Sequence, residues 1–128
     1  MGLHIYEYSD DCLSLDFPLL KSFTLTGGTI KLKINCPLLQ SLVFEHLDNL
    51  RFCEFSSLDF LETIQTDTTL VPFPSVLKNS ITLREVTWKV VVDYYWPNIE
   101  YLSLQGQVSN SFINQLQSLK VLHLSGFK

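Results

Sequence analysis

One short pattern of apolar and polar positions is repeated along the chain. An apolar residue is followed by two variable positions, a second apolar residue, one variable position and, in most copies, a third apolar residue. The copies occupy residues 18–25, 37–44, 59–66, 97–104 and 117–124. Their leading apolar residues, which follow one another at steps of 19, 22, 38 and 20 residues, are Leu20, Leu39, Leu61, Ile99 and Leu119. Self-similarity on this scale is typical of a repeat protein.

The 38-residue step leaves room for one more unit. Residues 80–83 supply its predicted strand, although Leu77 lies one residue too far upstream to fit the pattern. We therefore expect six units, of which the fourth is distorted.

The spacing within each unit predicts a short strand. Two apolar residues separated by one variable residue point to the same face of a strand, and their neighbours point to the other face. The leading apolar residue then fills the interior at the corner before the strand. One such coil buries its apolar side only when the next coil stacks on it, which explains why the pattern recurs.

This pattern resembles the leucine-rich-repeat family, whose phrase L-x-x-L-x-L lays down one short parallel strand per coil. The resemblance covers residues 17–127 and implies a strand-dominated α/β solenoid of about six irregular coils, with a parallel concave sheet and few short helices. The copies preceded by Pro, as in residues 36–42, look most like the irregular repeats behind F-box motifs in eukaryotic ubiquitin-ligase adaptors, although the chain shows no F-box. Regular members of the family carry Asn or Cys three residues after the phrase, where this chain has Gly28, Leu47, Thr69, Val86, Gln107 and Phe127.

The segments between the copies predict a return side made mostly of strands and loops. Residues 29–34 alternate apolar with polar, and residues 50–55 and 86–92 are similarly suited to strands. Only residues 109–117 have the spacing of a helix, with Ser109 as its cap. We expect a single domain over residues 1–128. The last copy is followed by residues 126–128 without a polar capping segment, which leaves two alternatives open: the chain is a fragment of a longer one, or a partner covers its end.

Composition narrows the classes of partner. Hydrophobic residues make up 46% and charged residues 17%, which favours a folded chain over a disordered one. The net charge is −4 and the largest basic cluster is Lys31 with Lys33, so nucleic acid is not an expected partner. No apolar run approaches the roughly 20 residues of a membrane span. The three cysteines, Cys12, Cys36 and Cys53, suit reduced thiols and an intracellular location, cytoplasmic or nuclear.

Residues for chemistry are present but not in catalytic or metal-binding patterns. The chain has no G-x-S-x-G nucleophile motif. Its histidines, His4, His46 and His123, do not form the close pairs with cysteine that structural zinc sites use. The pair Gly27-Gly28 lacks the further residues of a phosphate-binding loop and indicates a turn. We therefore expect no enzyme activity, no metal and no cofactor.

The aromatic residues around position 90 have two interpretations. Aromatic side chains with a polar tip are enriched at binding hot spots, and they also fill the cores and cover the flanks of solenoids. Both interpretations stay open at this stage for Trp88, Tyr94, Tyr95 and Trp96.

The variable residues between the apolar ones should project from the concave sheet. They are mostly small and polar, which suits hydrogen-bonded recognition of a protein better than a small-molecule pocket. The plainer alternative is a merely solvated face, because any alternating strand produces such residues. The predicted partner-binding residues are Ser22, Thr24, Ser41, Val43, Glu45, Thr63, Gln65, Asp67, Thr82, Arg84, Tyr101, Ser103 and His123.

The sequence thus predicts a protein–protein interaction module that binds a protein partner through its concave sheet. The resemblance to F-box adaptors implies the substrate-recognition part of a ubiquitin-ligase adaptor. Two other functions stay open: an architectural or capping segment of a larger protein, and a small hydrolase or transferase.

Overall fold

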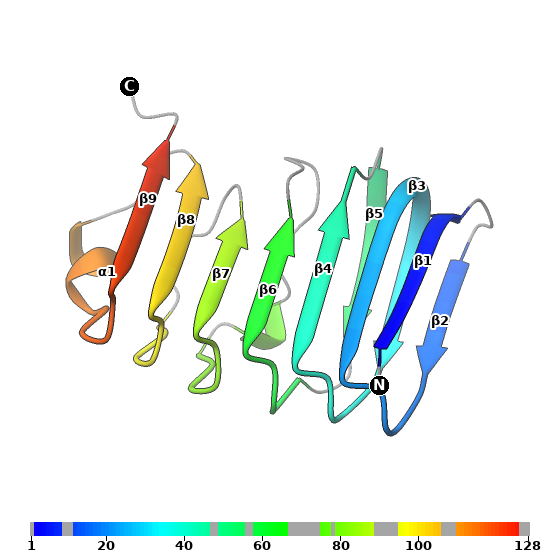
Figure 1. Ribbon diagram of the computed structural model, residues 1–128, viewed down its shortest axis with the longest axis horizontal. Coiled ribbons are helices and arrows are strands. Elements are labelled where there is room, and N and C mark those ends of the chain that lie inside the picture. Colours follow the sequence, from blue (N-terminus) through cyan, green and yellow to red (C-terminus); the bar gives the residue numbers. More distant parts are fainter. Residues whose placement is uncertain are drawn as a thin grey trace.

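The computed structural model shows a solenoid in which strands predominate (Figure 1). It describes residues 2–8, 12–46, 49–55, 58–66, 75–77, 79–88, 95–105 and 110–125. The strands in these ranges are β1 (Gly2–Tyr8), β2 (Cys12–Asp16), β3 (Ser22–Asn35), β4 (Ser41–Glu45), β5 (Asn49–Phe55), β6 (Thr63–Thr66), β7 (Glu85–Trp88), β8 (Tyr101–Gln105) and β9 (Val121–Ser125). The helices are a 3-10 turn, η1 (Ser75–Leu77), and α1 (Asn110–Asn114).

One face of the solenoid is a sheet that we name the front sheet. Its strands follow the order β1-β3-β4-β6-β7-β8-β9, and every neighbouring pair is parallel. Figure 1 shows these strands side by side in chain order, from blue to red. Two parallel neighbours need a crossover between them, so the chain returns behind the front sheet after each strand.

A second, smaller sheet lies behind the first and is named the return sheet. It consists of β2, residues 29–35 of β3, and β5, again all parallel. Strand β3 belongs to both sheets, and Gly27, with φ of 76°, lies between its two halves. This conformation favours glycine. The pair Gly27-Gly28 is therefore a bend within one strand, where the sequence predicted a turn between elements.

The core lies between the front sheet and the return segments. Burial alternates along β4 as the strand pattern requires, with Leu42 and Phe44 buried and their neighbours half-buried. Each fully buried side chain of this kind stabilises the fold by roughly 1.5–3 kcal/mol. The equivalent buried pairs of the other copies are Phe23 and Leu25, Ile64 and Thr66, Val86 and Trp88, and Leu102 and Leu104.

A tight turn of one kind precedes five strands of the front sheet, β3, β4, β6, β8 and β9. The N–H of Leu39 donates to the carbonyl of Cys36 at 3.1 Å, and the same bond closes the turns at Leu20, Leu61, Ile99 and Leu119. Three of these turns have Pro in their second position, where its fixed φ suits a turn. The residue that accepts the bond is itself buried in four turns, at Cys36, Leu58, Trp96 and Leu116. The repeated unit therefore begins three residues earlier than its leading apolar residue.

A second set of hydrogen bonds joins each corner to the next. The carbonyl of Lys21 accepts the N–H groups of Gln40 and Ser41, at 2.7 and 3.1 Å. In four later corners, the carbonyl of the residue after the leading apolar residue also accepts two N–H groups from the next corner. These residues are Gln40, Glu62, Arg84 and Glu100. These carbonyls, which we name the corner carbonyls, hold successive strands in one register.

The number of turns differs from the sequence expectation. The chain forms a β-solenoid of about four turns, fewer than the six coils expected. Counting copies of the pattern overestimates turns, because the pattern marks strands of the front sheet, whereas a turn also needs its return segment. The parallel sheet, the predominance of strands and the scarcity of helices are confirmed.

Several individual elements also differ. The predicted strand at residues 80–83 is wrong, because these residues form the corner before β7. The strands predicted at 29–34 and 50–55 are confirmed as parts of the return sheet. The helix is shorter than predicted, over Asn110–Asn114, and its proposed cap Ser109 lies outside the described residues. Strands β1 and β2 lie outside the copies of the pattern and were not predicted.

Candidate functional site

The outward side chains of the front sheet form rows across its strands. Parallel register places equivalent residues beside one another, roughly 4.8 Å apart from strand to strand. We name one row the middle row; it consists of His4, Thr24, Val43, Gln65, Thr87, Ser103 and His123. A second, the lower row, lies nearer the corners and consists of Gly2, Ser22, Ser41, Thr63, Glu85, Tyr101 and Val121.

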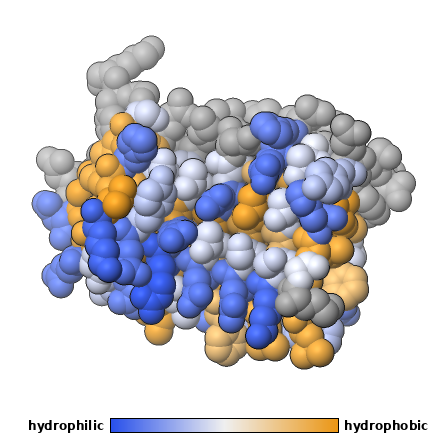
Figure 2. All heavy atoms as spheres, in the orientation of Figure 1, coloured by the Kyte–Doolittle hydropathy of each residue, from blue (hydrophilic) through white to orange (hydrophobic). Residues whose placement is uncertain are grey.

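Most of the residues expected to bind a partner do lie on this face. Gln65 and His123 are exposed, and the remaining ones of this group are half-buried between neighbouring strands. Figure 2 shows the face as mainly blue and white over the middle strands, with orange near β9 and along the lower margin. Asp67 lies outside the described residues. The predicted residues that the front sheet displays are Ser22, Thr24, Ser41, Val43, Glu45, Thr63, Gln65, Tyr101, Ser103 and His123.

Thr82 and Arg84 are not on the outward face, which corrects their predicted position. Both precede β7, in the corner of that coil. The Oγ1 of Thr82 donates to the carbonyl of Leu61 at 2.8 Å, so this hydroxyl ties one corner to the previous one. Arg84 carries a corner carbonyl and extends its side chain toward acidic neighbours.

The positions that the prediction gave to Thr82 and Arg84 belong to Glu85 and Thr87. These two pair with Thr63 and Gln65 on one side and with Tyr101 and Ser103 on the other. The signal was present in the sequence, since Leu83, Val86 and Trp88 have the spacing of the pattern, and all three are buried. The presence of Val and Trp in place of Leu concealed it.

The first strand adds two aromatic side chains to the face. His4 and Tyr6 stack with ring centroids 3.9 Å apart, and the Tyr6 side chain is exposed. Nε2 of His4 and Oγ1 of Thr26 are hydrogen-bonded at 2.8 Å, which links β1 to β3 across the outward face. Neither residue was predicted to lie on this face, because both precede the first copy of the pattern.

A row of alternating charges follows the corners of the later coils. Arg84 lies between Glu62 and Glu100, with N–O distances of 4.0 and 3.2 Å. Nζ of Lys120 lies 2.8 Å from Oε1 of Glu100. We name these four residues the charge ladder. They occupy the same position in successive units, one residue after the leading apolar residue, so the repeat itself brings them together.

The charge ladder should make stability depend on pH. The hydrogen bond from Lys120, then that from Arg84, holds the pKa of Glu100 below its ordinary value. A lowered pKa in the folded state contributes stability that is present above the unfolded-state pKa and is lost as the pH falls through the folded-state pKa. We expect Glu100→Gln to destabilise the protein slightly at neutral pH and not at acidic pH below both values, measured by urea unfolding at each pH. A difference that persists unchanged at the acidic pH would contradict this role, and added salt should reduce it at neutral pH.

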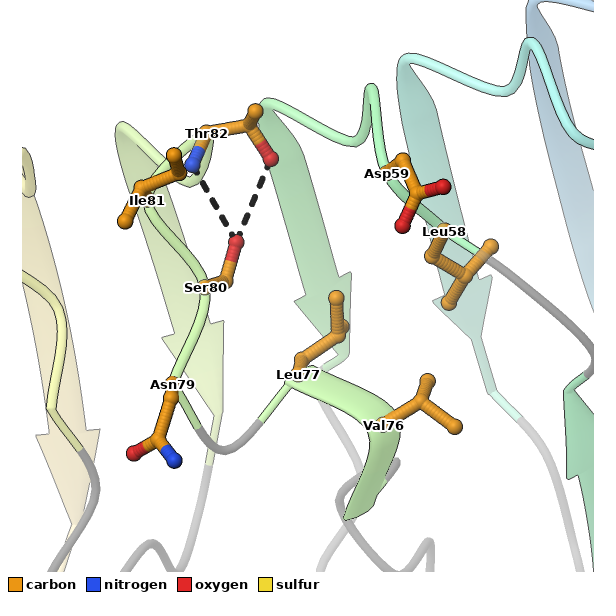
Figure 3. A pocket seen from close by; sticks show the side chains of 8 residues that line it. All are labelled: Leu58, Asp59, Val76, Leu77, Asn79, Ser80, Ile81 and Thr82. Atoms are coloured by element: carbon orange, nitrogen blue, oxygen red, sulfur yellow. Dashed lines mark hydrogen bonds between the residues drawn. The ribbon is translucent and has the colours of Figure 1, made fainter.

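A cavity of about 250 Å³ opens at the corner before β7 (Figure 3). Leu58 and Asp59 line it from the preceding corner, and Val76 and Leu77 line it from η1. The rest of its wall is the irregular corner, in which the Oγ of Ser80 accepts the N–H groups of Thr82 and Leu83, both at 3.3 Å. A serine hydroxyl thus caps this corner, where four other corners place a buried apolar residue. A shallower hollow of about 450 Å³ lies beside the charge ladder, between Arg84 and Lys120.

The two tryptophans in the aromatic cluster are core residues. Trp96 is fully buried, donates from Nε1 to the carbonyl of Leu77 at 2.8 Å, and packs edge-on against Phe112 of α1. Trp88 is also buried and packs edge-on against Phe44. Tyr95 is exposed, and Tyr94 lies outside the described residues. For Trp88 and Trp96 the structure favours the core interpretation.

The described residues offer limited chemistry for a metal or a nucleophile. They contain no group of three or more His, Cys, Asp or Glu side chains placed to hold a metal ion. Burial raises the pKa of the Cys36 thiol, which lies 3.9 Å from the carbonyl of Leu15 and is free of disulfide bonding. A buried thiol with a raised pKa is a poor nucleophile. In the described part of the chain, no helix is long and apolar enough to cross a membrane.

Comparisons with known proteins add no relative. No family model, no curated protein and no solved structure matches the chain.

Proposed function

We propose that this chain is a protein-binding module that engages a partner protein through the outward face of its front sheet. The observation that carries the proposal is the alignment of small polar side chains from successive strands in the middle and lower rows. Backbone hydrogen bonds and corner carbonyls fix the spacing of these rows, so binding would order few additional groups. Low ordering cost favours affinity.

The composition of the face supports a protein as the partner. Hydroxyl groups of Ser22, Thr24 and Thr63 can donate and accept hydrogen bonds, and Tyr101 adds an aromatic side chain with a polar tip. The rows consist mostly of small half-buried side chains, whereas the usual site of a small ligand is a concave apolar pocket. The charge of −4 and the scattered basic residues favour protein over nucleic acid.

The pattern also supports a more specific identity for the module. We propose that the solenoid is an irregular relative of leucine-rich-repeat proteins and serves as the substrate-recognition part of an intracellular ubiquitin-ligase adaptor, without chemistry of its own. The support is the L-x-x-L-x-L spacing, including its newly located copy at Leu83, Val86 and Trp88, together with the preceding Pro. The buried, reduced thiol of Cys36 is consistent with an intracellular location.

Substitution on the two sheets tests the binding face. We expect Ser103→Arg or Val43→Arg to reduce partner capture at least about tenfold, because a long charged side chain in the middle row prevents close contact. Capture from cell extract would be measured by quantitative mass spectrometry against the unsubstituted protein. The matched control is Ser14→Arg, since Ser14 is exposed on β2 of the return sheet.

Folding of each variant would be checked first by circular dichroism and thermal unfolding. Retention of the same partners by folded Ser103→Arg and Val43→Arg would contradict the proposed face. Loss of those partners from Ser14→Arg alone would move the binding site to the return sheet.

A further inference from the structure

We propose that the open edge of β9 binds an extended segment of a separate polypeptide, which adds to the front sheet as a parallel strand. The segment would carry an acidic residue at the corner position and apolar residues at the two inward strand positions. This edge is distinct from the outward face of the front sheet. Three observations lead to the same description of the segment.

The first observation is the exposure of side chains that should be in the core. Leu122 of β9 is equivalent to Leu102 of β8 by register, yet it is 37% exposed where Leu102 is 0% exposed. Leu124 is half-buried, whereas its equivalent Leu104 is buried. Figure 2 shows the apolar surface near β9 as an orange area at one end of the front sheet. Another strand with apolar inward residues would cover it.

The second observation concerns the backbone at the same edge. Strand β9 pairs with β8 on one side and with no described strand on the other. Because the N–H of Val121 donates toward β8, the alternation of a parallel ladder directs the backbone groups of Leu122 and Leu124 to the open edge. The corner carbonyl of Glu100 accepts two N–H groups of the following corner, but none of the described residues donates to the carbonyl of Lys120. A parallel strand with its own corner supplies both donors.

The third observation is the unfinished alternation of the charge ladder. Arg84 has an acidic neighbour on both sides, Glu62 and Glu100. Lys120 has Glu100 on one side, 2.8 Å away, and the open edge on the other. An acidic residue in the next corner would continue the order of acid, base, acid, base. Charge complementarity therefore selects an acidic corner and disfavours a basic one.

The chain itself has no spare strand of this description among its described residues. In the front sheet, the described strands preceded by an acidic corner residue are β6 and β8, and each is already paired on both edges. A second copy of the chain would thus bring no free front-sheet strand with an acidic corner to Lys120. The proposal of a segment from a different polypeptide therefore rests on charge complementarity with Lys120. Addition of a strand to an exposed sheet edge is a general mode of peptide recognition.

A peptide copy of residues 97–105 provides the probe, because it contains Ile99, Glu100, Leu102 and Leu104 in the required order. The fluorescently labelled peptide would be titrated with the 128-residue chain and followed by anisotropy. We expect binding, and we expect the peptide carrying Glu100→Lys to bind on the order of fivefold more weakly, as for an exposed ion pair. The peptide carrying Leu102→Asp and Leu104→Asp should not bind measurably.

Charge reversal on the protein supplies the decisive comparison. The variant Lys120→Glu should bind the Glu100→Lys peptide more tightly than the original peptide. Non-specific hydrophobic binding to an apolar edge would not produce this preference. Lys21→Glu is the matched control, because Lys21 occupies the equivalent corner position, two residues before Phe23, at the other end of the series of corners. This substitution should leave the affinities for both peptides unchanged. Amide chemical shifts of Leu122 and Leu124 should move when the peptide is added.

Other results would overturn the proposal. These are an absence of binding, equal binding of the two peptides to wild-type and Lys120→Glu protein, or shifts confined to β1. Sedimentation velocity tests the remaining occupant, a second copy of the chain. A dimer that is lost in the Leu122→Asp variant, and that persists when the peptide is added, would show that a second copy occupies the edge.

Discussion

Replacing Trp96 by Ala is expected to lower the free energy of unfolding by about 3–5 kcal/mol, the usual cost of deleting a buried aromatic side chain. Trp96 is fully buried and packs edge-on against Phe112, so the substitution leaves a cavity between the corner before β8 and helix α1. It also leaves the carbonyl of Leu77 without the N–H donor that lies 2.8 Å away. Since domains are stable by only about 5–15 kcal/mol, this loss would unfold a large fraction of a marginal protein.

Two further substitutions separate the causes. Trp96→Phe keeps much of the packing but removes the donor, and should cost about 1–3 kcal/mol. Tyr95→Ala is the control, because Tyr95 is 49% exposed and its loss should change stability by less than about 0.5 kcal/mol. All three would be measured by urea unfolding followed by far-ultraviolet circular dichroism. Equal effects of Trp96→Ala and Tyr95→Ala would contradict the core position of Trp96.

Replacing Leu83 by Ala is expected to cost about 2–5 kcal/mol, whereas Ile81→Ala should change stability by less than about 0.5 kcal/mol. Leu83 is 0% exposed and is the leading apolar residue of the coil that contains β7. Ile81 is 67% exposed at the corner. The pair distinguishes the two placements of this coil, because a strand at residues 80–83 would turn both side chains inward. Similar losses from both substitutions in urea unfolding would support that earlier placement.

Much of the front sheet could be predicted because its pattern is local. The copies that begin at Leu20, Leu39, Leu61 and Ile99 lie where the spacing placed them, and each leading residue is buried. Alternation along a strand then determines which residues face outward, so Thr24, Val43 and Ser103 were assigned to the outward face from spacing alone. The sequence carries no such local signal for function, and the binding role of these residues is a proposal.

The missed features depend on contacts between distant residues. Among the described side chains of strand β1, Leu3 and Ile5 pack against the core, and the strand is held in the front sheet by its pairing with β3. The coil of β7 was misplaced because Val86 and Trp88 replace the usual leucines, while Ile81 imitates an inward residue. The charge ladder was not predicted because its members are 16 to 22 residues apart and meet only when the corners stack.

The corner carbonyls keep the register of the front strands constant, whereas the return segments between the corners vary in length. Leading residues of successive coils from Leu20 to Leu119 are 16 to 22 residues apart, yet every corner between them is joined to the next by the same two bonds. The shortest spacing, from Leu83 to Ile99, and the two longest, from Leu39 to Leu61 and from Leu61 to Leu83, give the same strand register. Insertions and deletions can therefore accumulate in the return segments during evolution while the pitch of the front sheet, and the spacing of anything bound along it, is inherited unchanged.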